Sequence, residues 1–280
     1  MNVGVIGYGF VGQATGLGFG SNKKNKVFWY DKFKESQNTL EEVVEKSDFI
    51  FVCVPTPIFE DYSGMDMSIV TGVIDDIAKS IEGTGKVLIL KSTSLPGTTK
   101  GLMKKYPKIN FVMNPEFLTQ INANRDFLNP ARTVLGAESK DVAERVVKLY
   151  KTILPKNQPY IIVSPTSAEV IKYMSNIVLA SKILVANEFY EISKAVGANY
   201  LEVQNGVESD PRIGSYLGVP GNDGQMGFGG ACFPKDIVGM IGLAKKLKVD
   251  VTALEAVWKK NLKIRKTRDW EKMPQAFKKK

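Results

Sequence analysis

One cysteine of this sequence stands where a catalytic nucleophile is expected. Cys232 ends the glycine-rich stretch GQMGFGGAC and is followed by FPKD, so a flexible loop can wrap a ligand and present the thiol at a helix start. A helix N-terminus and the nearby Lys235 both favour thiolate over thiol, and the thiolate is the nucleophile. The alternative, a buried inert cysteine, better describes Cys53, because Cys53 lies inside the apolar stretch FIFVCVP.

A second motif has the residues of a dinucleotide-binding loop. Gly7, Gly9 and Gly12 form GxGxxG after an apolar run and before a helical pattern. Such glycines permit a tight turn, the approach of a pyrophosphate to the backbone and close packing of the helix. Asp31 follows the second apolar run and suits the ribose hydroxyls of NAD, whereas it would repel the phosphate of NADP. The motif predicts NAD as the cofactor, and the alternative is a glycine turn that serves only packing.

The composition limits the remaining chemistry. The chain has no histidine, so acid and base catalysis must fall to Lys, Asp, Glu, Cys or water, and we expect no metal site. Two cysteines are too few for a disulfide framework and fit a reducing compartment. The apolar runs are too short to span a membrane, and the N-terminus lacks the features of a signal peptide. We therefore expect a cytoplasmic protein without a membrane partner.

The net charge of +9 is concentrated at the C-terminal end. Between Trp258 and Lys280, ten Lys or Arg residues stand against Asp269 and Glu271, which leaves a net +8 in this segment. This run indicates a solvated last helix with a frayed KKK end, because a nucleic-acid-binding face usually interleaves basic and aromatic residues. We expect no nucleic-acid partner, and attraction of an anionic ligand or surface is the alternative.

The elements that must position these residues fall into two groups. Short apolar runs bounded by Gly, Pro and Asp alternate with helical patterns such as 68–80 and 139–150, which is typical of buried parallel strands in a doubly wound Rossmann-type sheet. The runs lie at 3–7, 26–31, 48–55, 86–93, 109–115, 132–137 and 159–163. We therefore predict an α/β protein whose residues 1–165 form an NAD-binding domain.

The second predicted domain, residues 166–280, is all-helical and carries the cysteine loop and the basic tail. One long helix is expected over 167–197, with Ser167 as N-cap and Gly197 as C-cap, and two further helices near 235–247 and 252–268. The long helix is apolar on more than one face, so we expect a second subunit to cover it in a homodimer.

The stretch GFGGACFPKD resembles the catalytic-cysteine signature of the UDP-glucose and GDP-mannose dehydrogenases. Other stretches occur in the order of that family: VPTP at 54–57, KST at 91–93, NPEFL at 114–118, PxRxVxG at 130–136, AEVIKYMSN at 168–176 and DPRIG at 210–214. The resemblance implies oxidation of a nucleotide sugar by two successive hydride transfers to NAD, with UDP-glucose to UDP-glucuronate favoured. It also implies a thiohemiacetal and a thioester on the cysteine.

The resemblance further implies roles for catalytic residues besides Cys232. Lys172 would stabilise alkoxide character or mediate proton transfer, and Asn176, one helical turn later, would donate to the same oxygen. Asp236 would act as acid or base near the thiol. Thr93 and Glu116 would hold or activate the hydrolytic water. The alternative for Lys172 is a solvated charge on the helix surface.

Binding residues follow from the same resemblance. Those for the cofactor are Gly7, Gly9, Phe10, Val11, Gly12, Asp31, Val54, Pro55, Thr56, Ser92, Thr93, Gln120 and Lys235. Those for the substrate are Phe117, Leu118, Lys172, Asn176, Arg212, Phe228 and Gly229. Arg212 would reach the substrate across the dimer interface, and the alternative is a surface ion pair with Asp210.

The sequence also departs from the family pattern. Family members usually continue into a third, Rossmann-like domain that binds the nucleotide of the substrate, and this sequence carries no counterpart of it. The family often has an acidic residue where Gln120 stands. Two other functions remain open: a two-electron dehydrogenase of the β-hydroxyacid type, which leaves Cys232 unexplained, and a catalytically silent NAD-binding protein derived from the family.

Overall fold

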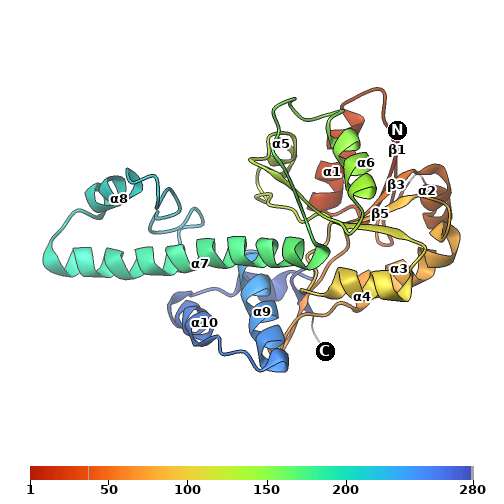
Figure 1. The fold of residues 1–280 in the computed structure, drawn as a ribbon. Helices are drawn as coiled ribbons and strands as arrows, with labels where there is room; N and C mark the ends of the chain where they lie inside the picture. The colour runs from red at the N-terminus through yellow and green to blue at the C-terminus, as the bar shows by residue number, and fades with distance from the viewer. Residues whose placement is uncertain (37, 279–280) are drawn as a thin grey trace. The chain divides into compact units, whose positions relative to one another are not determined.

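The computed structural model describes residues 1–36 and 38–278. The chain divides into two compact units, each built from two stretches of sequence. Unit 1 comprises Met1–Thr56 and Met67–Lys172, and unit 2 comprises Pro57–Asp66 and Tyr173–Lys280. Figure 1 shows the sheet and its helices in unit 1 and the mostly helical unit 2.

Unit 1 is built on a seven-stranded sheet with the order β2-β1-β3-β5-β6-β7-β8. Its strands are β1 (Asn2–Ile6), β2 (Lys26–Tyr30), β3 (Phe49–Val52), β5 (Val87–Leu90), β6 (Asn110–Met113), β7 (Thr133–Gly136) and β8 (Tyr160–Val163). Each lies within a predicted apolar run, except that β1 begins one residue before its run. One feature corrects the prediction of an all-parallel sheet, because β7 pairs with β6 in the antiparallel direction. A parallel pair needs a connection that crosses back over the sheet. The connection between β6 and β7 carries only a short helix and does not cross back.

Helices cover both faces of this sheet, which confirms the doubly wound fold (Figure 1). The helices of unit 1 are α1 (Phe10–Gly20), α2 (Leu40–Lys46), α3 (Ser68–Ile81), α4 (Thr98–Lys105), α5 (Ala123–Leu128) and α6 (Lys140–Tyr150). Successive strand residues point to opposite faces. Phe51 therefore packs in one core cluster with residues of α1, α5 and α6, and Ile50 packs in the other with residues of α2, α3 and α4.

The long helix α7 (Pro165–Val196) is close to the predicted range. Its N-terminus corrects the predicted cap, because the hydroxyl of Ser164 accepts a hydrogen bond from the Ser167 amide at 3.1 Å. Pro165 explains the shift, since proline is favoured at the first helical position. Gly197 ends the helix with a φ of +74°, and the Ala198 amide bonds to the Ser193 carbonyl at 2.8 Å, as expected of a glycine C-cap.

The remaining elements belong to unit 2, and all of them except the first contribute residues to one apolar core. They are α8 (Tyr200–Glu208), α9 (Phe233–Leu247), α10 (Thr252–Ile264) and a 3₁₀-helix η1 (Asp269–Lys272), with a small parallel sheet of β4 (Ile58–Phe59) and β9 (Phe277–Lys278). The core includes Leu184, Phe228, Trp258 and Trp270. Helix α8 and the two-stranded sheet were not predicted, because short elements carry little periodicity.

The C-terminal segment corrects the prediction of a solvated tail. The side chain of Trp270 is fully buried, Phe277 is 8% exposed, and Arg265 is 5% exposed. The Lys278 ammonium forms an ion pair with Asp66 at 2.6 Å. Aromatic residues spaced along the segment anchor it to the core, while most of its lysines face outward. Residues 279 and 280 of the predicted frayed end lie outside the described residues.

Within the described chain, no helix is long and apolar enough to cross a membrane. A search of the same residues finds no group of three or more His, Cys, Asp or Glu side chains that could hold a metal ion.

Candidate active site

The glycine loop after β1 has the geometry that its residue types predict. Gly7 has a φ of +86°, a conformation that other residues rarely adopt. A Cβ on Gly12 would stand 2.0 Å from the carbonyl oxygen of Gly7, whereas a Cβ on Gly9 would meet no atom within 4 Å. Gly7 and Gly12 therefore shape the turn, and Gly9 leaves open space before the first turn of α1.

This open space fits the diphosphate of a dinucleotide. Helix α1 begins at Phe10, its first turn contains no acidic residue, and no described side chain caps it, so its first amides and its positive dipole end are available to an anion. Asp31 follows β2, and its carboxylate accepts hydrogen bonds from the Tyr8 amide at 2.6 Å and the Phe33 amide at 2.9 Å. This places an acidic side chain beside the loop, as ribose recognition requires.

We predict that Gly9→Ala weakens NAD binding without unfolding the protein. The φ of Gly9 is −69°, which alanine adopts freely, so the change at the cap should cost less than about 1 kcal/mol of stability. The added methyl would obstruct the approach of the diphosphate and its charge-assisted hydrogen bonds, so we expect NAD affinity to fall at least about tenfold by calorimetry. Gly72→Ala in α3, also in open space, is the matched control and should bind NAD normally.

Two other predicted cofactor residues line one pocket in unit 1. Phe10 and Gln120 belong to a cavity of about 340 Å³ that also includes Gln13 and Arg125. The Ser92 hydroxyl is within 2.7 Å of the Val54 carbonyl, to which it donates a hydrogen bond. Among the remaining predicted positions, Thr56 is buried, Val11, Val54 and Thr93 are half-buried, and Pro55 is exposed.

A buried ion pair joins two of the predicted catalytic residues of unit 1. The Lys172 ammonium on α7 donates to a carboxylate oxygen of Glu116 at 2.8 Å, and the two side chains are 3% and 6% exposed. The second Glu116 oxygen accepts the Leu118 amide at 2.7 Å. Burial opposes ionisation of Glu116, but the charge and hydrogen bond of Lys172 and the Leu118 amide outweigh it and lower the Glu116 pKa. Lys172 is therefore not the solvated surface charge of the alternative interpretation.

The predicted substrate residue Phe117 lies close to two cations. The Arg132 guanidinium stands 4.3 Å from the centre of the ring, and the Lys172 ammonium stands 5.6 Å from it. Both distances are within the range of cation–π attraction. The Phe117 ring therefore lies next to the Glu116–Lys172 pair.

Sequence analysis missed a buried lysine next to this pair. Lys91 directly follows β5 and is 4% exposed, and its ammonium donates to the Asn114 side chain at 3.0 Å. The Tyr150 hydroxyl donates to the same Asn114 oxygen at 2.6 Å. Burial lowers the pKa of Lys91 to about 8. Asn114 begins the stretch that carries Glu116, so Lys91 helps to hold that stretch in place. The KST stretch quoted above contains Lys91, but no role was predicted for it.

Unit 2 presents the cysteine beside a second buried polar group. Cys232 is half-buried and is the N-cap residue of α9. One turn later, Asp236 is fully buried, and its carboxylate accepts the Asn176 amide at 2.6 Å and the Lys235 ammonium at 2.6 Å. The structure therefore brings together Asn176, Asp236 and Lys235. Lys235 and Asp236 lie on the helix that begins at the thiol, and Asn176 reaches them from α7. The Lys235 ammonium thus forms an ion pair with the Asp236 carboxylate. Its effect on the thiol stays a prediction.

Two predicted substrate residues of unit 2 contact other residues of the same chain. Arg212 is highly exposed, and its guanidinium forms an ion pair with Asp210 at 2.5 Å, which is the surface pair of the alternative interpretation. Phe228 belongs to the cysteine loop, but its ring is 2% exposed and packs in the core of unit 2. Gly229, in contrast, is half-buried within the loop itself.

Comparison with known proteins identifies the family. Residues 31–154 match the NAD-binding domain of the UDP-glucose/GDP-mannose dehydrogenase family, and residues 166–263 match the central domain of that family. The chain belongs to this family. The resemblance noted in the sequence is thus confirmed, and NAD is confirmed as the cofactor.

Several members resemble the chain over most of its length. A UDP-glucose 6-dehydrogenase of Rickettsia prowazekii is 30% identical over 93% of this chain and 67% of its own length. The UDP-glucose 6-dehydrogenase TuaD of Bacillus subtilis is 34% identical over 81% of this chain, which spans 49% of that relative. The solved UDP-glucose dehydrogenase of Pyrobaculum islandicum superposes with a TM-score of 0.83 at 29% identity, over 94% of this chain and 68% of its own. The chain thus spans about half to about two thirds of the length of these dehydrogenases.

Proposed function

We propose that this protein oxidises a nucleotide sugar to the corresponding uronic acid, with UDP-glucose as substrate and UDP-glucuronate as product. Two similar dehydrogenases bear the name UDP-glucose 6-dehydrogenase, and the chain has the NAD-binding domain that the oxidation needs. The observation that carries the proposal is a pair of buried contacts on consecutive turns of α7. Lys172 bonds Glu116 at 2.8 Å, and Asn176 bonds Asp236 at 2.6 Å.

The first oxidation requires a group that stabilises negative charge on the C6 oxygen of the sugar. Lys172 and Asn176 are four residues apart on α7, so both side chains project from one face of the helix. A cation and an amide donor aimed at one oxygen stabilise alkoxide character. Glu116 orients Lys172 through their hydrogen bond, and it can pass a proton to or from that ammonium. When bound, NAD accepts the hydride in each oxidation.

The second oxidation requires covalent capture of the aldehyde. The sulfur of Cys232 attacks the aldehyde carbon, so that a C–S bond forms and the carbonyl oxygen takes up a proton to give a thiohemiacetal. Removal of hydride from that carbon and loss of the hydroxyl proton leave a thioester. Water then attacks the thioester, and the C–S bond breaks to release the carboxylic acid and regenerate the thiol. Asp236, one helical turn from Cys232, is the group that we assign to proton transfer there, and Thr93 to holding the water.

The test is a panel of UDP- and GDP-sugars with NAD, with NADH counted per mole of sugar consumed. We expect two NADH per UDP-glucose and a uronic acid product. One NADH per turnover, together with oxidation of small hydroxyacids, would show instead a two-electron hydroxyacid dehydrogenase. Firm NAD binding without binding of any nucleotide sugar in calorimetry would identify a catalytically silent protein.

We also propose that α7 forms a homodimer interface. Large apolar side chains recur on this helix at intervals of three, four and seven residues and are between 48% and 74% exposed: Met174, Val178, Val185, Phe189, Ile192 and Val196. This spacing is that of a helix face which packs against another helix. A long apolar stripe of this kind is typical of a protein interface rather than of a free surface.

We predict that Val185→Glu converts a dimer into a monomer. A carboxylate at the centre of the apolar stripe would be buried without a partner, which a dimer interface does not tolerate. Light scattering after size-exclusion chromatography should therefore give half the mass of the unchanged protein. Val249→Glu is the matched control, because Val249 lies outside α7 and is 55% exposed against 53% for Val185. A dimer that survives Val185→Glu would place the interface elsewhere.

A further inference from the structure

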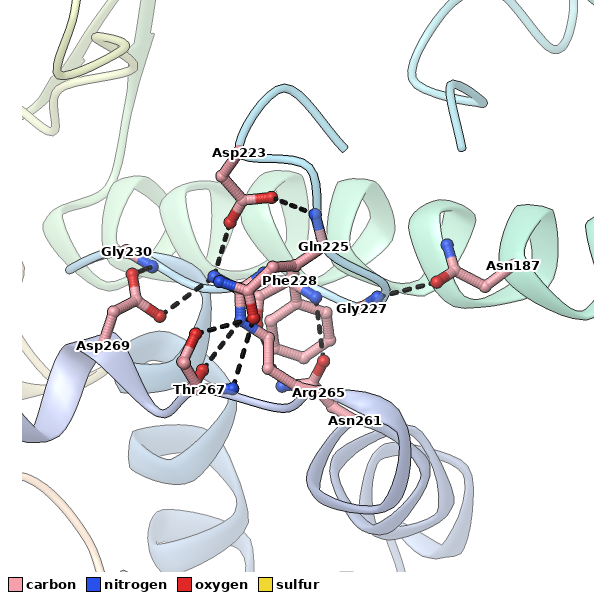
Figure 2. Close-up of polar contacts among 10 residues, drawn as sticks. All are labelled: Asn187, Asp223, Gln225, Gly227, Phe228, Gly230, Asn261, Arg265, Thr267 and Asp269. Carbon is pink, nitrogen blue, oxygen red and sulfur yellow. Dashed lines mark hydrogen bonds and ion pairs between the residues drawn. The ribbon is translucent and has the colours of Figure 1, made fainter. Parts of the chain in front are cut away.

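The loop that precedes Cys232 is bound at successive positions by side chains of three other segments. Figure 2 shows these contacts around the loop from Asp223 to Gly230. They come from α7, from α10 and from the segment that follows α10. Four of these side chains, Asn187, Asn261, Arg265 and Asp269, are called the loop clamp below. The loop is therefore fastened along its length, although its glycines suggested a flexible loop.

The two asparagines of the clamp bind the middle of the loop. The Asn187 side-chain oxygen accepts the Gly227 amide at 2.7 Å. The Asn261 side chain accepts the Phe228 amide at 2.8 Å and donates to the Phe228 carbonyl at 3.0 Å. Asn187 is 2% exposed and Asn261 is fully buried. Buried amides with satisfied partners hold one orientation, so they fix the path of the backbone at these two residues.

Arg265 holds both ends of the loop. Its guanidinium donates to Asp223 at 2.5 Å and to Asp269 at 3.0 Å, and its side chain is only 2% exposed. Asp269 in turn accepts the amide of Gly230 at 2.8 Å. Gly230 stands two residues before Cys232. The position of the cysteine is thus linked through one carboxylate to a buried arginine 33 residues further along the chain.

The clamp accounts for the glycines of the cysteine motif. A Cβ on Gly227 would stand 2.4 Å from the Asn261 oxygen, and a Cβ on Gly229 would stand 2.1 Å from the Arg265 guanidinium. Gly230 has a φ of +74°, which disfavours other residues. These glycines permit close approach of the clamp to the backbone. The glycines of the motif therefore serve close packing, and the conformation of the loop depends on Asn261 and Arg265 as well.

We infer that Arg265 and Asp269 are positioning residues for Cys232, which set where its thiol stands for capture of the aldehyde. This inference rests on the function proposed above for the thiol. A buried guanidinium between two carboxylates is costly to disturb, so the clamp resists displacement of the loop when a substrate enters. A thiol that is held loosely would let the aldehyde leave before the C–S bond forms.

The test compares Arg265→Met with Lys266→Met, a neighbouring exposed cation. The first readout is the rate at which iodoacetamide alkylates the folded protein. Cys53 is buried, and burial raises its pKa to about 12, so this rate reports on Cys232. We expect alkylation to be about fivefold faster or more in Arg265→Met, because a loop that opens more often exposes the half-buried thiol more often. Lys266→Met should label like the unchanged protein.

The second readout is the number of NADH formed per sugar. Arg265→Met should lower it from two towards one, because aldehyde escapes. A variant that is merely less stable has fewer active molecules but keeps the ratio of two. Arg265→Lys retains the charge and should be intermediate, since an ammonium cannot bridge both carboxylates in the same fork. Asp223→Asn removes the charge of one carboxylate that Arg265 binds. Because the Asp223 side chain is 46% exposed, this variant should fold even if Arg265→Met does not.

Alkylation rates within about twofold of the unchanged protein in Arg265→Lys and Asp223→Asn, with two NADH per sugar retained, would overturn the inference. The alkylation rate does not depend on turnover. If the unchanged protein oxidises no nucleotide sugar, the proposed function fails, and the labelling rates still decide whether the clamp positions the thiol.

Discussion

Cys232→Ser is expected to abolish formation of the uronic acid while the first oxidation survives. A serine hydroxyl at the start of α9 remains protonated at neutral pH, and no histidine is available to activate it, so it does not capture the aldehyde. Loss of a nucleophile of this kind should lower the rate of acid formation on the order of 10³-fold or more. Separation of the products should show aldehyde in place of acid, with about one NADH per sugar instead of two.

Cys53→Ser is the matched control for this experiment. Cys53 is 8% exposed within the core of unit 1, and burial raises its pKa to about 12, so its thiolate is absent at neutral pH. The variant should lose some stability but keep two NADH per sugar. Acid formation by Cys232→Ser at the rate of the unchanged protein would remove the cysteine from the mechanism and favour direct oxidation of a hydrated aldehyde.

The success of sequence analysis for unit 1 has a physical reason. Each inner strand of the sheet is a four- or five-residue, mostly apolar run that is buried on both faces, so its burial is reflected in consecutive residues. The glycine loop was predicted for a similar reason, because its turn, its helix and Asp31 are set by local geometry. The reversed direction of β7 was not predictable from Thr133–Gly136, since the direction of a strand depends on how its connection crosses the sheet.

The residues that sequence analysis missed act through contacts between distant parts of the chain. Arg265 bonds Asp223 across 42 residues, and Asn261 bonds Phe228 across 33. In the sequence, Arg265 is one of ten basic residues near the C-terminus, and nothing local distinguishes it from its exposed neighbour Lys266. The aromatic residues Trp258 and Trp270, near it in the sequence, are buried, but their spacing was not used to predict a buried side.

The charge of the site also depends on a contact between residues that are distant in the sequence. Lys172 and Glu116 lie 56 residues apart, and neither motif states that the two side chains form one buried pair. Once paired, each becomes costly to remove alone. This dependence distinguishes a buried catalytic pair from a surface ion pair, and it can be measured.

Lys172→Met is expected to reduce both stability and turnover, and a second substitution should separate the two effects. Removal of one partner of a buried ion pair typically costs about 3–5 kcal/mol, because the remaining charge keeps its desolvation penalty. Turnover should fall about 10²–10⁴-fold, as expected for loss of a group that stabilises charge or transfers a proton. The double variant Lys172→Met, Glu116→Gln should recover most of the free energy of unfolding in urea and none of the turnover.

The pH dependence gives a further check on this pair. In the unchanged protein the Glu116 pKa is lowered, so the stability that the pair contributes is present above the ordinary pKa of a glutamate and is lost as the pH falls through the lowered value. Without Lys172, burial raises that pKa, and the protonated carboxyl becomes the favoured form. The loss of stability caused by Lys172→Met should therefore shrink between pH 7 and pH 5, as measured by urea unfolding.

Lys105→Met provides the comparison that decides the argument. Lys105 also bonds a carboxylate, that of Asp75, at 2.8 Å, but these side chains are 54% and 44% exposed. Solvent screens an exposed pair, so this variant should leave the free energy of unfolding and the turnover nearly unchanged. An equal loss of stability in the two variants would show that Lys172 and Glu116 are not buried in solution. Loss of stability with normal turnover in Lys172→Met would remove Lys172 from the chemistry and leave it a structural role.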